Sequence, residues 1–257
     1  MTKIIVCGCF GRLGSVIGKL AEQDAAMELV AGVDITSPGG GLTYPVFTDI
    51  GDCTLPADAL VICLPPHAAT YITAQLHYAA VRAMPVVLCT TGLRPEVMEE
   101  IKKAAESTAV LVSANMALGI NLLANMLSKA ARLLYDANFD IEIIERHHNQ
   151  KLDAPSGTAY LLADTANAAL GGQMRIVCDR SSNRTPRQRE EIGMHALRGG
   201  SITGEHTVVF AGLDEVIELT HIAQSRDVFA VGALKAARFI KGKPAGYYTM
   251  QDVIENP

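Results

Sequence analysis

Short apolar runs alternate with segments of helical pattern through the first half of the chain, and this alternation restricts the fold more than any other feature. Parallel strands joined by helices are covered on both faces, so they are almost continuously apolar. The sequence therefore predicts an α/β fold with a parallel sheet. The expected strands cover residues 3–7, 28–33, 59–64, 85–90 and 109–113, and the expected helices cover residues 13–23, 67–83 and 95–106.

The pattern changes near residue 120, and the segment that follows predicts α+β structure with antiparallel character. Helical patterns cover residues 121–135, 156–170 and 227–241. Residues 139–146 alternate as in a strand with one solvated face. Residues 175–221 are mostly strand-like, and the strands expected over 202–210 and 215–221 flank a hairpin connection. The polar segment 183–191, which contains Arg184, Arg187 and Arg189, is expected to be an exposed loop.

Composition and charge exclude several classes of protein. Apolar residues make up 49% of the chain, and 22 basic against 27 acidic residues give a net charge of −5. A disordered chain has fewer apolar residues, and a nucleic-acid-binding protein usually has a basic balance. The sequence shows neither an apolar run of about 18 residues nor a signal-peptide pattern, so no membrane span or secretion is expected. The six cysteines are expected to be reduced packing residues of a cytoplasmic protein.

A glycine-rich segment between the first strand and the first helix predicts a dinucleotide site. Its residues, spaced G-x-x-G-x-x-G, are Gly8, Cys9, Phe10, Gly11, Arg12, Leu13 and Gly14. Such glycines allow a tight turn, close approach of backbone N–H groups to a pyrophosphate, and packing of helix on strand. Asp34 closes the second strand 20 residues after Gly14, where an acid can bind the adenosine ribose. The alternative interpretation is a glycine-rich turn without a ligand.

The cofactor is expected to be NADH or NADPH, with NADH favoured. An acid at the position of Asp34 favours NADH. The next residues, Ile35, Thr36 and Ser37, include no Lys or Arg that could bind the 2′-phosphate of NADPH. Arg12 could still reach the phosphate region. Further strand-to-helix loops that end at the same edge begin at Cys63, Cys89 and Ser113, although ordinary turn chemistry explains them equally well.

The densest group of reactive side chains lies at residues 145–159. Adjacent histidines, His147 and His148, and nearby Lys151 suit proton transfer and anion binding. Ser156 is expected to cap a helix whose first residues, Gly157 and Thr158, offer N–H groups to a carboxylate or phosphate. Metal binding is the rival interpretation. Adjacent strand residues point to opposite faces and no further His or Cys completes a set, so no metal is expected. The plain alternative is a solvated loop before a capped helix.

These segments closely resemble the dihydrodipicolinate reductase family of lysine and diaminopimelate biosynthesis. The resemblance spans nearly the whole chain. Its most specific part is the run His-His-x-x-Lys-x-Asp-Ala-Pro-Ser-Gly-Thr from His147 to Thr158, and residues 8–14, 89–92, 113–116, 204–207, 218–221 and 225–226 match as well. The family reduces 4-hydroxy-tetrahydrodipicolinate, a small cyclic dicarboxylate, with a nicotinamide cofactor.

The resemblance implies a role for each matching residue. The proton donor and acceptor falls on His147 and the second proton donor on Lys151. Substrate contacts fall on His148, Lys151, Ser156, Gly157 and Thr158. Cofactor contacts fall on Gly8 to Gly14, Asp34, Cys89, Thr90, Thr91, Ser113, Ala114, Asn115 and Met116.

Three departures from the family pattern bear on cofactor preference. Cys89 replaces the usual Gly, Met116 replaces a frequent Phe, and the Arg that follows the acid in NADPH-favouring members is missing after Asp34. The family also implies a homotetramer that forms through the sheet of the second domain.

The length of 257 residues is large for one ordinary domain and small for two complete α/β domains. We therefore expect a Rossmann-like dinucleotide-binding domain over 1–118, an inserted α+β domain with a mixed sheet over 119–226 for substrate binding and oligomerisation, and a C-terminal segment, 227–257, that returns to the first domain. Competing hypotheses are another two-domain dehydrogenase that acts on an aldehyde, hydroxy acid or cyclitol, and a dinucleotide-sensing regulator. A regulator would need no polar site around His147 and Lys151, and it should carry a DNA-binding or partner segment.

Overall fold

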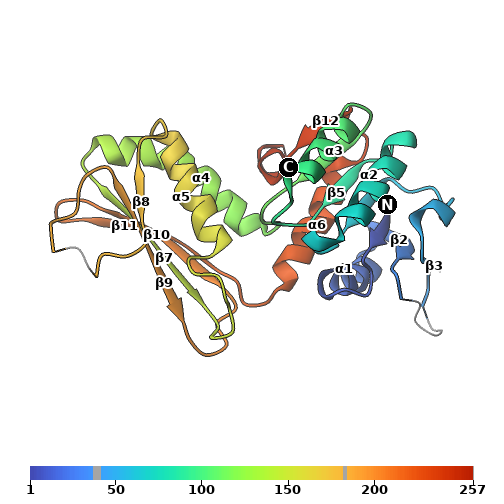
Figure 1. Cartoon of the computed structure of the whole chain (residues 1–257), viewed down its shortest axis with the longest axis horizontal. Helices are drawn as coiled ribbons and strands as arrows, with labels where there is room; N and C mark the ends of the chain where they lie inside the picture. The colour runs from blue at the N-terminus through green and yellow to red at the C-terminus, as the bar shows by residue number, and fades with distance from the viewer. Residues whose placement is uncertain (37–41, 182–183, 257) are drawn as a thin grey trace. The chain divides into compact units, whose positions relative to one another are not determined.

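The computed structural model describes residues 1–36, 42–181 and 184–256. The chain folds into two compact units. Unit 1 contains Met1–Leu118 and Asp227–Pro257, and unit 2 contains Gly119–Arg226 (Figure 1). The predicted fold class, a Rossmann-like parallel sheet together with a second, mixed sheet, is confirmed.

Unit 1 is built on a seven-stranded parallel sheet in the order β12-β6-β5-β4-β1-β2-β3. Its strands are β1 (Thr2–Cys7), β2 (Met27–Val33), β3 (Val46–Phe47), β4 (Ala59–Ile62), β5 (Val86–Leu88), β6 (Ala109–Val112) and β12 (Gly246–Tyr248). Its helices are α1 (Arg12–Gln23), α2 (Ala69–Val81), α3 (Pro95–Ala105), α6 (Asp227–Ile240) and α7 (Met250–Glu255), with 3₁₀ turns at Ile50–Asp52 and Pro66–Ala68.

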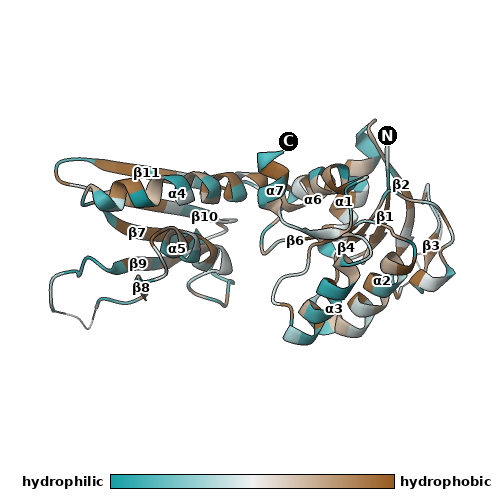
Figure 2. Cartoon of the chain, turned by 90° about the horizontal axis from the view of Figure 1, so that it is seen from above, coloured by the Kyte–Doolittle hydropathy of each residue, from teal (hydrophilic) through white to brown (hydrophobic). Residues whose placement is uncertain are grey.

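Two apolar cores lie on opposite faces of this sheet. Ile5 and Cys7 of β1 point to the core under α2 and α3, whereas Ile4 and Val6 point to the core under α1, α6 and α7. Because successive strand residues point to opposite faces, each run must be apolar throughout. Figure 2 shows the result, with hydrophobic strands covered by helices that are hydrophilic on their outer sides.

Unit 2 contains a five-stranded sheet in the order β11-β10-β7-β9-β8. Its strands are β7 (Asp140–His147), β8 (Arg175–Val177), β9 (Glu191–Arg198), β10 (Glu205–Ala211) and β11 (Val216–Ile222), and its helices are α4 (Leu118–Asp136) and α5 (Gly157–Ala169). β10 is antiparallel to β7 and β11, while β9 is parallel to β7 and β8. Both helices pack on the sheet face that carries Ile141 and Ile143.

Some elements differ from the prediction. The sequence does not predict β3, β8, β9, β12 or α7 individually. β3, β8 and β12 have only two or three residues, which carry too little periodicity to be recognised, and β9 lies within the segment 175–221 that is expected only to be mostly strand-like. Arg187 and Glu191 are not parts of a simple exposed loop. The Arg187 guanidinium donates to Asp140 at 2.7 Å and to Glu142 at 2.9 Å, and Glu191 is buried at the start of β9. Residue 183 of the predicted loop lies outside the described residues.

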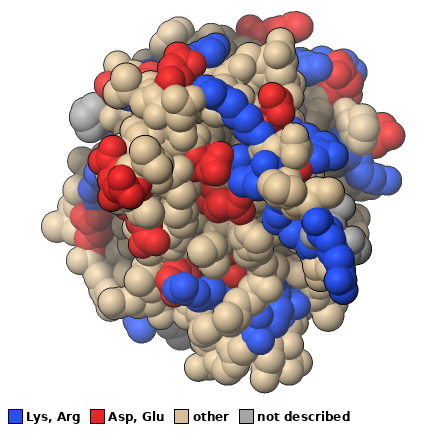
Figure 3. Space-filling view, turned by 90° about the vertical axis from the view of Figure 1, so that its left-hand side faces the viewer, with Lys and Arg blue, Asp and Glu red and all other residues tan. Residues whose placement is uncertain are grey.

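Charged side chains of both signs lie close together on the surface. Figure 3 shows a face on which Lys and Arg side chains gather beside Asp and Glu side chains. The pairs formed by Arg187 with Asp140 and Glu142 are of this mixed kind. No helix of the described residues is long and apolar enough to cross a membrane.

Candidate active site

The turn after β1 shows why each glycine of the sequence motif is needed there. Gly8 has a φ of +78°, a conformation that favours glycine. Gly11 donates its N–H to the Gly8 carbonyl at 3.0 Å and forms the N-cap of α1. A Cβ on Gly14 would overlap the same carbonyl oxygen. These contacts bring the first turn of α1 against the end of β1, and within the described chain no side chain caps that turn. Its N–H groups thus offer an anion site.

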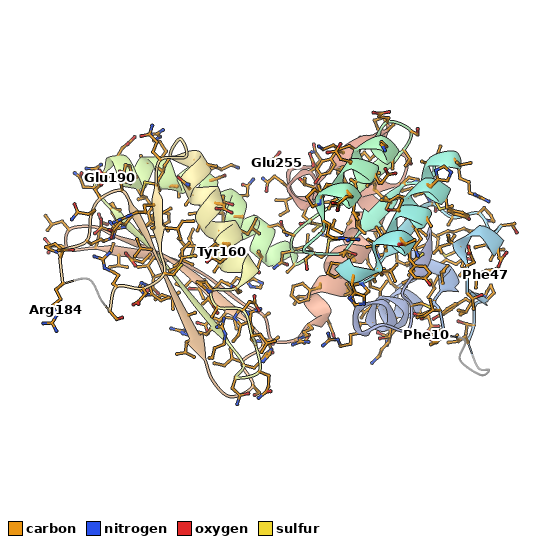
Figure 4. All side chains as sticks on the ribbon, in the orientation of Figure 1. Phe10, Phe47, Tyr160, Arg184, Glu190 and Glu255 are labelled. Carbon is orange, nitrogen blue, oxygen red and sulfur yellow. The ribbon has the colours of Figure 1, made fainter. Side chains whose placement is uncertain are left out.

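Asp34, which follows β2, stabilises this turn through hydrogen bonds. One carboxylate oxygen accepts the N–H of Phe10 at 3.0 Å, and the other accepts the Thr36 hydroxyl at 3.1 Å. Phe10 lies in the turn before α1 (Figure 4). A carboxylate has about four acceptor positions, so Asp34 retains capacity to accept from a hydroxyl of a bound ribose.

A cavity of about 550 Å³ opens beside this turn. Its size is in the range of small-molecule pockets. Among the predicted cofactor residues, it is lined by Gly8, Phe10, Gly11 and Asp34. Its wall also includes residues with no role predicted from the sequence, among them Thr48, Leu64, His67 and Tyr71. The loop after β4 is predictable as the end of a parallel strand, and this is the sequence signal for the part of the wall that contains Leu64.

The remaining predicted cofactor residues do not line this cavity. Cys9 and Met116 are buried, and Leu13 packs on the same apolar core. The Thr90 hydroxyl donates to the Leu64 carbonyl at 2.6 Å. The others belong to the turns at the carboxyl ends of β5 and β6 or to the start of α1, and they are Arg12, Gly14, Cys89, Thr91, Ser113, Ala114 and Asn115. The Ser113 hydroxyl donates to the Asn115 carbonyl at 2.8 Å, so these residues organise their own turn.

In unit 2, the alternation of β7 directs Glu145 and His147 to the buried face. The Glu145 carboxylate is fully buried and accepts four hydrogen bonds. One oxygen accepts from His147 Nδ1 at 2.7 Å and Arg198 Nη1 at 2.7 Å. The other accepts from Arg198 Nη2 at 2.7 Å and the Ser156 N–H at 3.0 Å. Burial alone would raise the pKa of Glu145, but the bonds from Arg198 and His147 outweigh it and lower this pKa.

His147 presents its other ring nitrogen away from Glu145. Nδ1 must donate, because the carboxylate only accepts, so Nε2 is the atom available for proton exchange. A Cβ on Gly204 would lie 3.1 Å from Nε2, so glycine leaves this nitrogen uncovered. Burial lowers the pKa of His147, although Glu145 counteracts part of this effect.

Ser156 and His206 form a second buried pair beside the first. The Ser156 hydroxyl accepts the Ala159 N–H at 3.1 Å, as a helix N-cap does, and lies 2.9 Å from His206 Nε2. The rings of His147 and His206 meet edge to face with centroids 5.1 Å apart. Burial lowers the pKa of His206 to about 4. The predicted cap is therefore confirmed, while the side chain of Ser156 is engaged inside the protein.

Cationic groups surround the loop between β7 and α5. Lys151 Nζ lies 2.8 Å from an Asp153 carboxylate oxygen, and its charge acts on His147. Arg226 Nη2 lies 3.2 Å from His148 Nε2. Gly157 and Thr158 begin α5, so their N–H groups lie at the positive end of this helix. Positive side chains and a helix N-terminus suit a substrate with two carboxylates.

Four further residues of this site, Glu145, Arg198, His206 and Arg226, have no role predicted from the sequence. The period of two over 139–147 places Glu145 on the same face as His147, so that pair was detectable. Arg198 lies 53 residues from Glu145 and reaches it only because β9 pairs with β7. In the described part of the chain, no three His, Cys, Asp or Glu side chains form a group that could hold a metal ion.

Known proteins match this chain over almost its full length. A family model for the dihydrodipicolinate reductase N-terminus matches residues 2–116, and one for the C-terminus matches residues 119–254. A 4-hydroxy-tetrahydrodipicolinate reductase of Clostridium novyi is 44% identical over 100% of this chain and 99% of its own length. The enzyme of the same name from Caldanaerobacter subterraneus is 45% identical over 99% of both chains.

A solved structure supports the fold. The dipicolinate-bound dihydrodipicolinate reductase of Paenisporosarcina sp. TG-14 matches with a TM-score of 0.82 over 98% of this chain and 99% of its own, at 24% identity. The two family models together cover residues 2–116 and 119–254 of this chain. The chain belongs to the dihydrodipicolinate reductase family.

Proposed function

We propose that this oxidoreductase uses a nicotinamide dinucleotide to reduce 4-hydroxy-tetrahydrodipicolinate to tetrahydrodipicolinate, the step in lysine and diaminopimelate biosynthesis for which its family is named. The observation that carries the proposal is the buried Glu145–His147 pair beside Lys151 and the start of α5. This arrangement combines a proton-exchanging group with anion-binding groups, which reduction of a cyclic dicarboxylate requires. Unit 1 is the proposed dinucleotide-binding domain and unit 2 the proposed substrate and oligomerisation domain.

The turn after β1 fits a nicotinamide dinucleotide. Three features support this assignment. A Cβ on Gly8 or Gly14 would collide with nearby backbone atoms, the first turn of α1 has no side-chain cap, and a cavity opens beside Asp34. The first turn of α1 would hold the pyrophosphate, and Asp34 would hold the adenosine ribose. The bound cofactor supplies the hydride, while the protein orients and protonates the substrate.

The groups of unit 2 would hold and protonate the substrate. His148 and Lys151, together with the N–H groups of Gly157 and Thr158, bind its carboxylates, and Ser156 positions that helix start. His147 exchanges a proton at Nε2, since Nδ1 faces Glu145. Lys151, an ammonium with three donor hydrogens, is the second proton donor.

We propose a preference for NADH over NADPH. No Lys or Arg occurs from residue 20 to residue 81, and this stretch contains Asp34 together with most of the residues that line the cavity. A 2′-phosphate near Asp34 would therefore meet a carboxylate, with Arg12 at the start of α1 as a possible basic partner. Like charges in a pocket repel, so calorimetric titration should give a lower Kd for NADH.

We also propose a homotetramer in the cytoplasm. The unit 2 sheet packs α4 and α5 on one face, and its other face carries exposed apolar side chains at Leu197, Val216 and Ile222. A second copy that covers this face would remove these side chains from water. All six cysteines are free thiols, which agrees with a reducing compartment.

A turnover assay tests the activity directly. The product of dihydrodipicolinate synthase serves as substrate, and oxidation of NADH or NADPH is followed by absorbance. His147→Gln and Lys151→Ala should each lower kcat by about 10²–10⁴-fold, the usual contribution of a proton-transferring group, while the Kd for NADH stays unchanged.

His77→Gln and Lys103→Ala serve as matched controls, since both side chains are exposed on helices of unit 1. They should retain the parent rate. A parent enzyme that oxidises neither cofactor in the presence of substrate would refute the activity, and normal turnover of His147→Gln or Lys151→Ala would refute that residue's role.

A further inference from the structure

Glu145 touches both parts of the candidate site in unit 2 at once. One of its oxygens accepts from the His147 ring at 2.7 Å, and the other accepts from the Ser156 N–H at 3.0 Å. Ser156 is the N-cap of α5, so its position sets where Gly157 and Thr158 lie. The same carboxylate is thus bonded to the proton-exchanging ring and to the start of the proposed substrate-carboxylate site.

Arg198 holds this carboxylate in place. Its two terminal nitrogens each donate to a different Glu145 oxygen at 2.7 Å, which is the bidentate geometry that orients a carboxylate most strictly. Arg198 Nη2 also donates to the Asp153 carbonyl at 2.6 Å, within the loop that precedes α5. With four donors, the acceptor positions of Glu145 are filled, and its orientation is fully determined.

We propose that Glu145, oriented by Arg198, is a positioning residue that holds neutral His147 in the Nδ1–H tautomer and keeps Nε2 as the exchange atom. The inference rests on the proposed role of His147. A free imidazole has a choice of tautomers, and a hydrogen bond at one nitrogen decides which form is present. Gly204, which leaves Nε2 uncovered, completes the arrangement.

The charges around His147 allow a prediction for its titration. Glu145, Lys151 and Arg198 act on the ring, and the ring of His206 packs against it. Among the three charged groups, Glu145 raises the pKa of His147, while Lys151 and Arg198 lower it. Loss of the Glu145 charge should therefore move the His147 titration to lower pH.

The test is ¹⁵N NMR of the histidine rings, with the His147 signals assigned from their absence in His147→Gln. In the parent protein, His147 should show a protonated Nδ1 and an unprotonated Nε2. In Glu145→Gln, the Nδ1–H form should lose population and the titration midpoint should fall. In the assay, kcat should fall at least about tenfold, as for other groups that orient a reacting side chain, whereas the Kd for NADH should not change.

Two further variants keep the test decisive. Glu145→Gln leaves the Arg198 cation without its anionic partner, so Glu145→Gln/Arg198→Met removes both charges in case the single variant fails to fold. It should lose the same tautomer preference. Glu142→Gln is the matched control, because Glu142 also pairs with a histidine at 2.7 Å and an arginine at 2.9 Å, but from the opposite face of β7. It should leave the His147 signals unchanged.

The proposal would be overturned if the His147 tautomer and the His147 titration midpoint stayed the same in both Glu145 variants. Glu145 would then have a purely structural role. A parent protein without turnover would instead refute the proposed function. The NMR result needs no substrate, so the two failures remain distinguishable.

Discussion

Two buried histidines with touching rings have different partners. His147 donates to a carboxylate, whereas His206 shares a bond with the hydroxyl of Ser156. Without an anion of its own, His206 is dominated by burial, which lowers its pKa to about 4. Burial lowers the pKa of both histidines, and the hydrogen bond to Glu145 counteracts part of this effect at His147.

The stability of the protein should decrease in mild acid because of His206. The unfolded chain binds a proton at this residue below pH 6.5, while the folded chain does so only below about 4. The free energy of unfolding should thus fall as pH drops from 6.5 to 4. From pH 7 to pH 5, His206 should account for a loss of about 2 kcal/mol.

Urea denaturation of the parent and of His206→Gln at both pH values measures this contribution. The variant should lose less stability between pH 7 and pH 5, although burial also lowers the pKa of His147 and His221, and these two remain. His77→Gln, an exposed control, should behave like the parent. An equal loss in the parent and in His206→Gln would contradict the assignment.

Among the elements, α6 comes from the C-terminal part of the chain but packs on the sheet formed mainly by the N-terminal part. It packs with α1 on one face of the unit 1 sheet, and most of its buried residues are Ala or Gly, including Ala230, Ala233 and Ala237. Small residues allow close approach to the strands and to the turn after β6. Gly232 marks the closest approach, since a Cβ there would overlap the Met116 carbonyl oxygen.

Gly232→Ala should therefore destabilise unit 1 by about 1–3 kcal/mol, the usual cost of overpacking a core. Gly18→Ala in α1 is the matched control. Its Cβ would lie 3.4 Å from Leu29 Cδ2, and alanine favours a helix over glycine by about 1 kcal/mol, so this variant should be neutral or slightly stabilised. Thermal and urea unfolding of both variants measures the difference, and equal stability of the two would contradict the packing argument.

At the scale of the whole molecule, the face of the unit 2 sheet opposite α4 and α5 bears on how copies of the chain associate. Val216 and Ile222 are 60% and 62% exposed on β11, and Leu197 is 46% exposed on β9. We expect a second copy of the chain to cover this surface, because removing apolar side chains from water is favourable.

Light scattering coupled to size exclusion should give a mass near four times 27.4 kDa. Val216→Lys/Ile222→Lys places two cations on this sheet face and should yield smaller species. Val81→Lys, which changes a 70% exposed side chain on α2, should keep the parent mass. A monomeric parent would contradict the proposed tetramer.

The parts of the site that were predictable are those that lie close together in the sequence. The glycine turn, the Ser156 cap and the alternation that places His147 inward are local patterns of a few residues. The predicted contact of Met116 with a cofactor lacks this support, since its side chain packs in the apolar core. The family resemblance implies a contact at this position of the motif, but the motif does not tell whether an apolar side chain there faces a core or a ligand.

The sequence by itself determined the fold class, the elements of strong periodicity and the family, because period, turn chemistry and motif spacing are written along the chain. Only the tertiary structure decided that Arg198 meets Glu145 and that Gly204 leaves His147 Nε2 uncovered. It likewise decided that α6 lies against the turn at Met116. These contacts join residues tens to more than a hundred positions apart. Their geometry arises from strand pairing and close packing, which no local pattern in the sequence encodes.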